Sequence, residues 1–194
     1  MAQGAGSRPM KLLKHRCNSQ QEIDSALYNG FDGVEIDLVW NDGSLVLSHE
    51  HGGVGEDFFT VDFHGYTVAI NVKEYGMCNI LCNVQNDTIG EQFLFDVPGP
   101  ELHDYVSQGG RVFFRFSEYE YPTKVPAGCG VLVDSFENSS KFVEQCLDEH
   151  VGLETATIGA SLRGAAERTP PTPPTYLICK EKPCNLSSST STVS

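Results

Sequence analysis

The sequence predicts an α/β fold, a reduced (β/α)8 TIM-like barrel with short or missing crossover helices. Three observations lead to this prediction. Short apolar runs of strand length recur along the chain and are separated by helical or loop-like segments. The first two runs, at residues 11–16 and 33–40, flank an amphipathic segment in a strand–helix–strand arrangement. Polar and charged residues collect where the runs end, which is the position of the active face in parallel barrels.

The amino-terminal elements have the clearest local signals. Ser19, followed by Glu22 three residues later, has the spacing of a capping box and predicts the start of a helix, which Asn29-Gly30 ends. Asn41-Asp42-Gly43 is a hairpin-type turn after the second strand, and it leads into an extended run that ends at His49.

Further strands are expected at residues 67–73, 92–96, 111–116 and 130–134, with weaker candidates at 155–160 and 176–179. Helices are expected at residues 77–86, 101–108 and 139–149. A proline-rich stretch at 170–174 is expected to be extended. Since 194 residues is less than the roughly 250 of a typical barrel, several crossover helices must be short or absent. A doubly wound sheet is the weaker alternative, because no glycine-rich first turn supports it.

The bulk composition limits the classes of function. A net charge of −13 argues against electrostatic binding of nucleic acid. No apolar stretch approaches the ~20 residues of a membrane helix, and no secretory signal is recognisable, so integral membrane association is not expected. Seven irregularly spaced cysteines favour a cytoplasmic protein with reduced thiols. We expect a flexible leader at 1–9, a barrel domain at 10–184 and a disordered tail at 185–194; the oligomeric state stays open.

Two carboxylates interrupt the second apolar strand. Glu35 and Asp37 alternate with Val34, Ile36 and Leu38, so the two acids share one face, with Cα atoms roughly 7 Å apart. Two carboxylates on a largely buried face are costly unless a positive charge lies between them, which predicts a divalent cation. The alternative is an edge strand whose solvent face carries both acids.

Two histidines and three cations accompany this pair. His15 and His49 fit a general acid–base pair, since imidazole titrates near neutral pH. Arg16 and Lys73 are suited to binding phosphate oxygens, with pairing to Glu35 or Asp37 as the alternative role. Arg115 is a third candidate for substrate binding, and its alternative role is an ion pair with Asp134 or Glu118.

These motifs together resemble the glycerophosphodiester phosphodiesterase family and, more broadly, the phospholipase-C-like phosphodiesterase superfamily. The resemblance rests on His15-Arg16, Glu35-Ile36-Asp37, His49 and Asn71-Val72-Lys73. The segments 96–98, 115–120 and 134–136 are similar to a bacterial branch of uncharacterised members. The likeness covers residues 10 to 140 well and the remainder faintly.

The resemblance implies a metal-dependent phosphoric diester hydrolase acting on a small-molecule phosphodiester. Mg²⁺ or Ca²⁺ would be held by Glu35, Asp37 and Asn71, with acid–base catalysis by His15 and His49. A hydroxyl of the substrate next to the phosphate would give a cyclic intermediate.

Three departures from the family pattern keep other functions open. Asn71 stands where the family has a third acidic ligand, and Cys17-Asn18-Ser19 replaces a glutamate–asparagine element. The proline-rich stretch at 170–174 replaces the last crossover helix. One alternative is therefore a catalytically degenerate barrel that serves as a binding or regulatory module. Another is a metal-dependent barrel acting on sugars or carboxylates, which would leave Lys73 and Arg16 underused.

Overall fold

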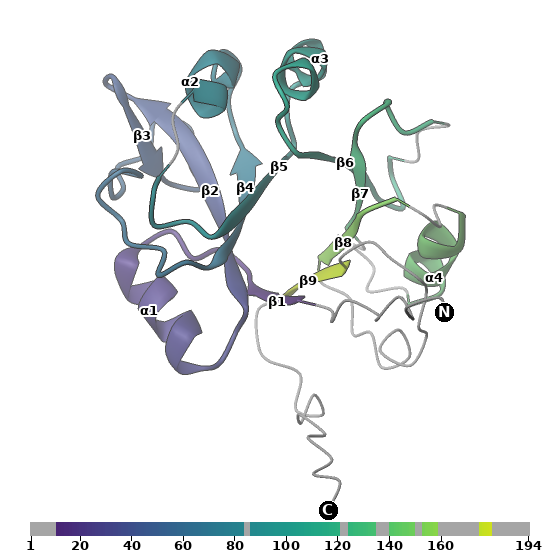
Figure 1. Cartoon of the computed structure of the whole chain (residues 1–194), viewed down its shortest axis with the longest axis horizontal. Helices are drawn as coiled ribbons and strands as arrows, with labels where there is room; N and C mark the ends of the chain where they lie inside the picture. Colours follow the sequence, from purple (N-terminus) through teal and green to yellow (C-terminus); the bar gives the residue numbers. More distant parts are fainter. Residues whose placement is uncertain are drawn as a thin grey trace, which may run out of the picture.

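The computed structural model describes residues 11–83, 86–120, 124–134, 140–149, 153–158 and 175–179 (Figure 1). In this part of the chain the strands are β1 (Lys11–Lys14), β2 (Gly33–Asn41), β3 (Ser44–Leu47), β4 (Thr67–Val72), β5 (Glu91–Phe95), β6 (Val112–Phe116), β7 (Gly130–Asp134), β8 (Thr155–Ile158) and β9 (Thr175–Cys179). The helices are α1 (Gln20–Tyr28), α2 (Cys78–Asn83), α3 (Gly99–Ser107) and α4 (Ser140–Glu149).

Eight of these strands close into a parallel barrel. The order around the barrel is β1, β2, β4, β5, β6, β7, β8 and β9, and β9 pairs in parallel with β1 to complete the ring. Figure 1 looks into this ring, with α1, α2, α3 and α4 outside it. The predicted reduced (β/α)8 barrel is confirmed.

Not all of the described connections between consecutive barrel strands contain a helix. Helices follow β1, β4, β5 and β7, whereas a hairpin strand and a long loop separate β2 from β4. Between β6 and β7, the described residues 117–120 and 124–129 contain no helix. The predicted leader, the tail and the proline-rich stretch at 170–174 lie outside the described residues. No helix in the described part of the chain is long and apolar enough to cross a membrane.

Three predicted elements begin or end at other residues in the structure. The first strand ends at Lys14 rather than residue 16, because Arg16 has a φ of 55° and cannot continue an extended strand. The helix predicted at 77–86 spans only Cys78–Asn83. The helix predicted at 101–108 begins two residues earlier, with Pro100 in its first turn, where its missing N–H costs no hydrogen bond.

The β2–β3 hairpin forms at the predicted turn. Asn41 pairs with Ser44, and the two turn residues Asp42 and Gly43 both have positive φ, of 46° and 90°. This conformation matches the twist of the flanking strands and is favoured by an Asp-Gly sequence. The hairpin carries the chain back along β2, so that His49 returns to the level of Asp37.

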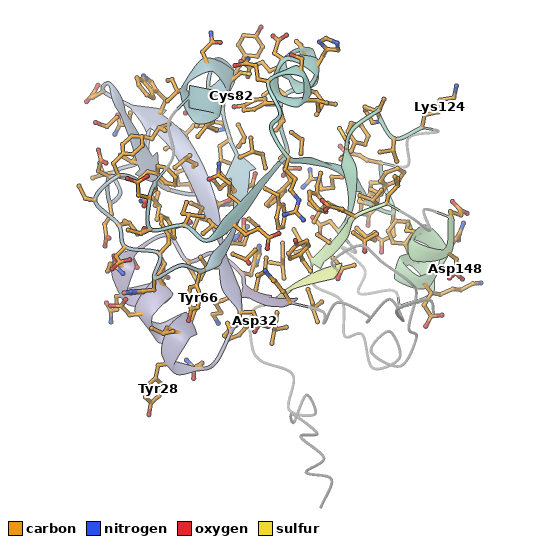
Figure 2. All side chains as sticks on the ribbon, in the orientation of Figure 1. Tyr28, Asp32, Tyr66, Cys82, Lys124 and Asp148 are labelled. Atoms are coloured by element: carbon orange, nitrogen blue, oxygen red, sulfur yellow. The ribbon has the colours of Figure 1, made fainter. Side chains whose placement is uncertain are left out.

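Apolar side chains pack on both surfaces of the barrel wall. Val34, Ile36 and Leu38 of β2 face outward and belong to the same core as Ile23 and Ala26 of α1. A separate cluster fills the interior, as the side chains inside the ring in Figure 2 show. Its buried members are Leu13, Ala69, Phe93, Phe95, Phe113, Leu132, Ala156, Ile158, Tyr176 and Ile178. The interior of the barrel is therefore filled by packed apolar side chains, and the polar groups lie towards its two ends.

Candidate active site

The two carboxylates of β2 point into the barrel. Glu35 is the register partner of Ala69, which belongs to the interior cluster, and Asp37 is the partner of Asn71. Glu35 and Asp37 are only 0% and 1% exposed. The alternative of an edge strand with both acids on its solvent-exposed face is therefore excluded, since β2 is hydrogen-bonded on both sides and its acids are buried.

Glu35 is held by the turn that follows β1. The main-chain N–H of Arg16 donates to its Oε2 over 2.7 Å, and His15 Nε2 lies 3.5 Å from the same oxygen. Burial, followed by the negative charge of Asp37, raises the pKa of Glu35 to about 8, although the Arg16 amide partly offsets this. Its other oxygen, Oε1, is buried without a hydrogen-bond partner among the described residues.

Asp37 is surrounded by donors. Lys73 Nζ lies 2.9 Å from Oδ1, while Asn18 Nδ2 donates to Oδ2 over 3.0 Å. His49 Nδ1 lies 3.2 Å from Oδ2. Burial opposes ionisation of Asp37, but the Asn18 and Lys73 hydrogen bonds and the nearby positive charge outweigh it and lower its pKa. The alternative role that we assigned to Lys73, an ion pair with the acid pair, is thus observed.

Asn18 is a member of the site that the sequence analysis did not include among its candidate residues. Its Oδ1 accepts the main-chain N–H of Asp37 over 2.8 Å, so its amide bridges both the backbone and the side chain of that residue. The helix cap itself is Ser19, whose side chain accepts from the Glu22 N–H. The signal that could have found Asn18 is its position just after His15-Arg16, at the carboxyl end of the first strand.

The oxygen atoms at the centre of the site fit a hard cation in part. Glu35 Oε1 and Asn71 Oδ1 are both buried without a hydrogen-bond partner among the described residues, and oxygen donors are what Mg²⁺ and Ca²⁺ prefer. However, no group of three His, Cys, Asp or Glu side chains in the described ranges could hold a metal. The residues therefore suit a cation that is held by few protein oxygens and keeps several waters.

A cavity of about 360 Å³ opens beside the acid pair. It lies over the carboxyl ends of β4, β5 and β6, and both polar and apolar side chains line it. Asn71 and Lys73 connect it to Asp37, through strand pairing and through the ion pair respectively. The lining residues are Asn71, Val72, Lys73, Asp96, Val97, Leu102, Phe113, Phe114, Arg115 and Glu120.

Arg115 lines this cavity but is already engaged with acids. Its guanidinium lies 3.2 Å from Asp96 Oδ1, 3.5 Å from Asp134 Oδ2 and 3.8 Å from Glu120 Oε2. Burial raises the pKa of both Asp96 and Asp134 in spite of the arginine. The expected ion pair with Asp134 is present, and Asp96 and Glu120 supply further contacts. Arg115 thus has less capacity left for a substrate phosphate than Lys73.

The other arginine and histidine side chains that the structure describes lie outside the centre of the site. The side chain of Arg16 is exposed beside the site, while its main-chain amide holds Glu35. His51 and His64 contact carboxylates outside the site, and His103 is exposed. The structure thus brings His15, His49, Lys73 and Asn71 to the acid pair and places Arg115 across the cavity.

The comparisons with known proteins give no further identification. No family model matches this chain, and no curated protein sequence matches it.

Proposed function

We propose that this chain is a metal-dependent phosphoric diester hydrolase, similar to the glycerophosphodiester phosphodiesterases. One observation carries the proposal. Two buried carboxylates, Glu35 and Asp37, are each contacted by a histidine, and they lie beside a cavity that Lys73 lines. Acids, imidazoles and an ammonium in one place suit a reaction that moves protons while negative charge develops on phosphate oxygens.

The metal would be Mg²⁺ or Ca²⁺, with Glu35, Asp37 and Asn71 as protein ligands. When bound, such an ion polarises a phosphoryl oxygen and stabilises the charge that develops on it. Asn71 contributes an oxygen without a charge, and Asp37 already forms an ion pair with Lys73. We therefore expect weak binding of the ion.

The two histidines would carry the protons. Each imidazole has a carboxylate beside one ring nitrogen, His15 at Nε2 and His49 at Nδ1. A carboxylate in this position fixes the orientation of the ring and determines which ring nitrogen faces the substrate. One histidine would accept the proton of the nucleophile, either water or a neighbouring substrate hydroxyl, and the other would protonate the leaving alkoxide.

Lys73 and Arg16 would hold the phosphate, and the cavity would take one of its two alcohol groups. Lys73 lies between Asp37 and the cavity, so a phosphate there would face the ammonium and the histidines together. Val97, Leu102 and Phe114 offer an apolar wall, while Asp96, Arg115 and Glu120 offer hydrogen bonds to hydroxyls.

The test is hydrolysis of a glycerophosphodiester such as glycerophosphoethanolamine, which has an alkoxide leaving group and a hydroxyl next to the phosphate, with Mg²⁺ or Ca²⁺ and again after chelation with EDTA. Chelation should abolish turnover, and His15→Ala or His49→Ala should each lower kcat by about 10²–10⁴-fold, the usual contribution of a general acid or base. His103→Ala, at an exposed helical position, is the matched control and should retain full activity. Activity that is indifferent to chelation and survives both site variants would refute the mechanism.

A binding or regulatory module is the second candidate, and one contact favours it. Lys73 supplies Asp37 with a positive charge from within the chain, so the acid pair is partly neutralised without an ion. Thermal melting with and without millimolar Mg²⁺ or Ca²⁺ separates the two functions, because an ion that binds only the folded state must raise Tm. A Tm that no divalent ion changes favours the module.

We also propose that the protein works in the cytoplasm on a small molecule. Cys17, Cys78, Cys82 and Cys129 are free thiols in the described part of the chain. Free thiols in this number are typical of a reducing compartment.

A further inference from the structure

Two cysteines lie in contact on one face of α2, outside the candidate active site. Cys78 and Cys82 are separated by one helical turn, and their Sγ atoms are 3.8 Å apart. Figure 2 labels Cys82 on this helix, outside the ring of strands. We propose that Cys78 and Cys82 form a reversible dithiol–disulfide site that a hydroperoxide oxidises. This inference does not depend on the proposed hydrolase activity.

The two thiols differ in a way that assigns their roles. Cys82 is half-buried, so a small oxidant can reach it, whereas Cys78 is only 4% exposed. Gln108, the residue that follows α3, donates from Nε2 to Cys78 Sγ over 3.7 Å. Burial, followed by the contact to Cys82, raises the pKa of Cys78 to about 12. Cys82 is therefore the attacking residue and Cys78 the resolving one.

The chemistry balances with one hydroperoxide molecule. The sulfur of Cys82 attacks the O–O bond of hydrogen peroxide and becomes a sulfenic acid, releasing one water. The sulfur of Cys78 then attacks that sulfur, the S–O bond breaks, and the hydroxyl leaves as a second water with the Cys78 proton. Two thiols and one peroxide give one disulfide and two waters.

Helix geometry makes the disulfide strained and hence reversible. Residues at positions i and i+4 of a helix have Cβ atoms about 5–6 Å apart, whereas a disulfide requires about 3.5–4.5 Å. Closing the bond must therefore tighten α2, which has only six residues and starts with hydrogen bonds from Ile80 and Leu81 to the Met77 carbonyl. Strained disulfides are easily reduced, which distinguishes a labile site from a structural bridge.

The position of the pair connects it to the cavity wall. Cys78 and Leu81 share an apolar core with Leu102 of α3, and Leu102 lines the cavity. A change in α2 on oxidation would therefore act on a helix that borders the candidate active site.

Peptide mapping of the intact chain tests the proposal. Trypsin releases residues 74–111 as one peptide that contains Cys78 and Cys82 and no other cysteine. After hydrogen peroxide, alkylation and digestion, we expect this peptide to lose two hydrogen atoms and to take up no alkylating agent. Glutathione added before alkylation should restore both thiols. Cys17, Cys129 and Cys146 are buried in the folded chain and lie in other tryptic peptides. Their thiols should remain alkylatable and serve as internal controls.

Cys82→Ser and Cys129→Ser form the matched pair of variants. Cys82→Ser should abolish the loss of hydrogen, and Cys129→Ser should leave it intact, with circular dichroism to confirm that both fold. Three outcomes would overturn the proposal: a 74–111 peptide that keeps both thiols, one that gains oxygen atoms that glutathione does not remove, or a disulfide to another cysteine or another chain.

Discussion

Asp37 is held by several polar neighbours in the site. Its carboxylate contacts Lys73, Asn18 and His49, and its main-chain N–H is bonded to Asn18 as well. Glu35, two residues earlier, has one oxygen on the Arg16 amide and the other without a partner in the described part of the chain. The two acids thus differ in pKa because donors surround one of them and burial dominates the other.

The Lys73–Asp37 pair leads to a prediction about stability. Lys73→Met should lower the free energy of unfolding by about 1–3 kcal/mol, because it leaves a buried carboxylate oxygen without its donor. Asp37→Asn combined with Lys73→Met should cost less than the sum of the two single changes, since the double variant has no buried charge to leave unpaired. Urea denaturation of the four proteins measures the coupling. Additive losses would contradict a direct interaction.

At the scale of elements, β2 positions the site because its two faces have opposite chemistry. The odd-numbered Glu35 and Asp37 face the interior, and the even-numbered Val34, Ile36 and Leu38 belong to the outer core that also contains Ile23 and Ala26 of α1. A shift of register by one residue would exchange these faces, so the pairing of β2 with its neighbours must be tightly specified.

Gly33, at the start of β2, fixes this pairing and provides the second prediction. A Cβ atom at Gly33 would lie 2.1 Å from the Thr67 carbonyl oxygen and 2.6 Å from a Leu13 methyl carbon. Gly33→Ala should therefore destabilise the fold by about 1–3 kcal/mol or more, as overpacking against backbone does. Gly99→Ala, where nothing lies within 4 Å of the added atom, is the matched control. Equal melting temperatures for the two variants would show that β2 accommodates the methyl group.

At the scale of the whole molecule, the two ends of the barrel differ. The carboxyl end carries the acid pair and the cavity, whereas the amino end is closed by a network of ion pairs. Glu91 lies at its centre, contacted by Lys11, by Arg111 and by the hydroxyl of Tyr176. Arg111 also lies over the rings of Phe93, Phe113 and Tyr176 and pairs with Glu154. The network seals the apolar interior on the side away from the site.

This network predicts how stability responds to acid. Burial alone would raise the pKa of Glu91, but hydrogen bonds from Lys11, Arg111 and Tyr176 lower it from 4.5 to about 2. The unfolded chain thus binds the Glu91 proton more tightly than the folded chain, so the contribution is complete above pH 4.5 and is lost as the pH falls towards 2. Glu91→Gln should lower Tm at neutral pH and flatten its fall over this window. Glu144→Gln, at an exposed position, is the control, and its Tm should fall with pH as that of the unmodified protein does. If the Tm of Glu91→Gln falls with pH to the same extent, the network does not stabilise the fold in this way.

The sequence by itself determined the barrel and the composition of the site. Alternation along residues 33–40 is local information, and it correctly placed Glu35 and Asp37 on one face. Strand ends rich in polar residues predicted which side of the barrel would hold His15, His49, Lys73 and Asn71, because the carboxyl ends of parallel strands meet.

Only the tertiary structure decided which contacts these residues make. Asn18 contacts Asp37, and Arg115 contacts Asp96 and Asp134, and each of these pairs is separated by 19 residues in the sequence. The division of donors between Glu35 and Asp37 likewise comes from residues on other elements. The contact between Cys78 and Cys82 is local, but the burial that separates their roles comes from α3. Spacing along a chain shows which side chains share a face, whereas distances across the barrel depend on its closure, which no single segment encodes.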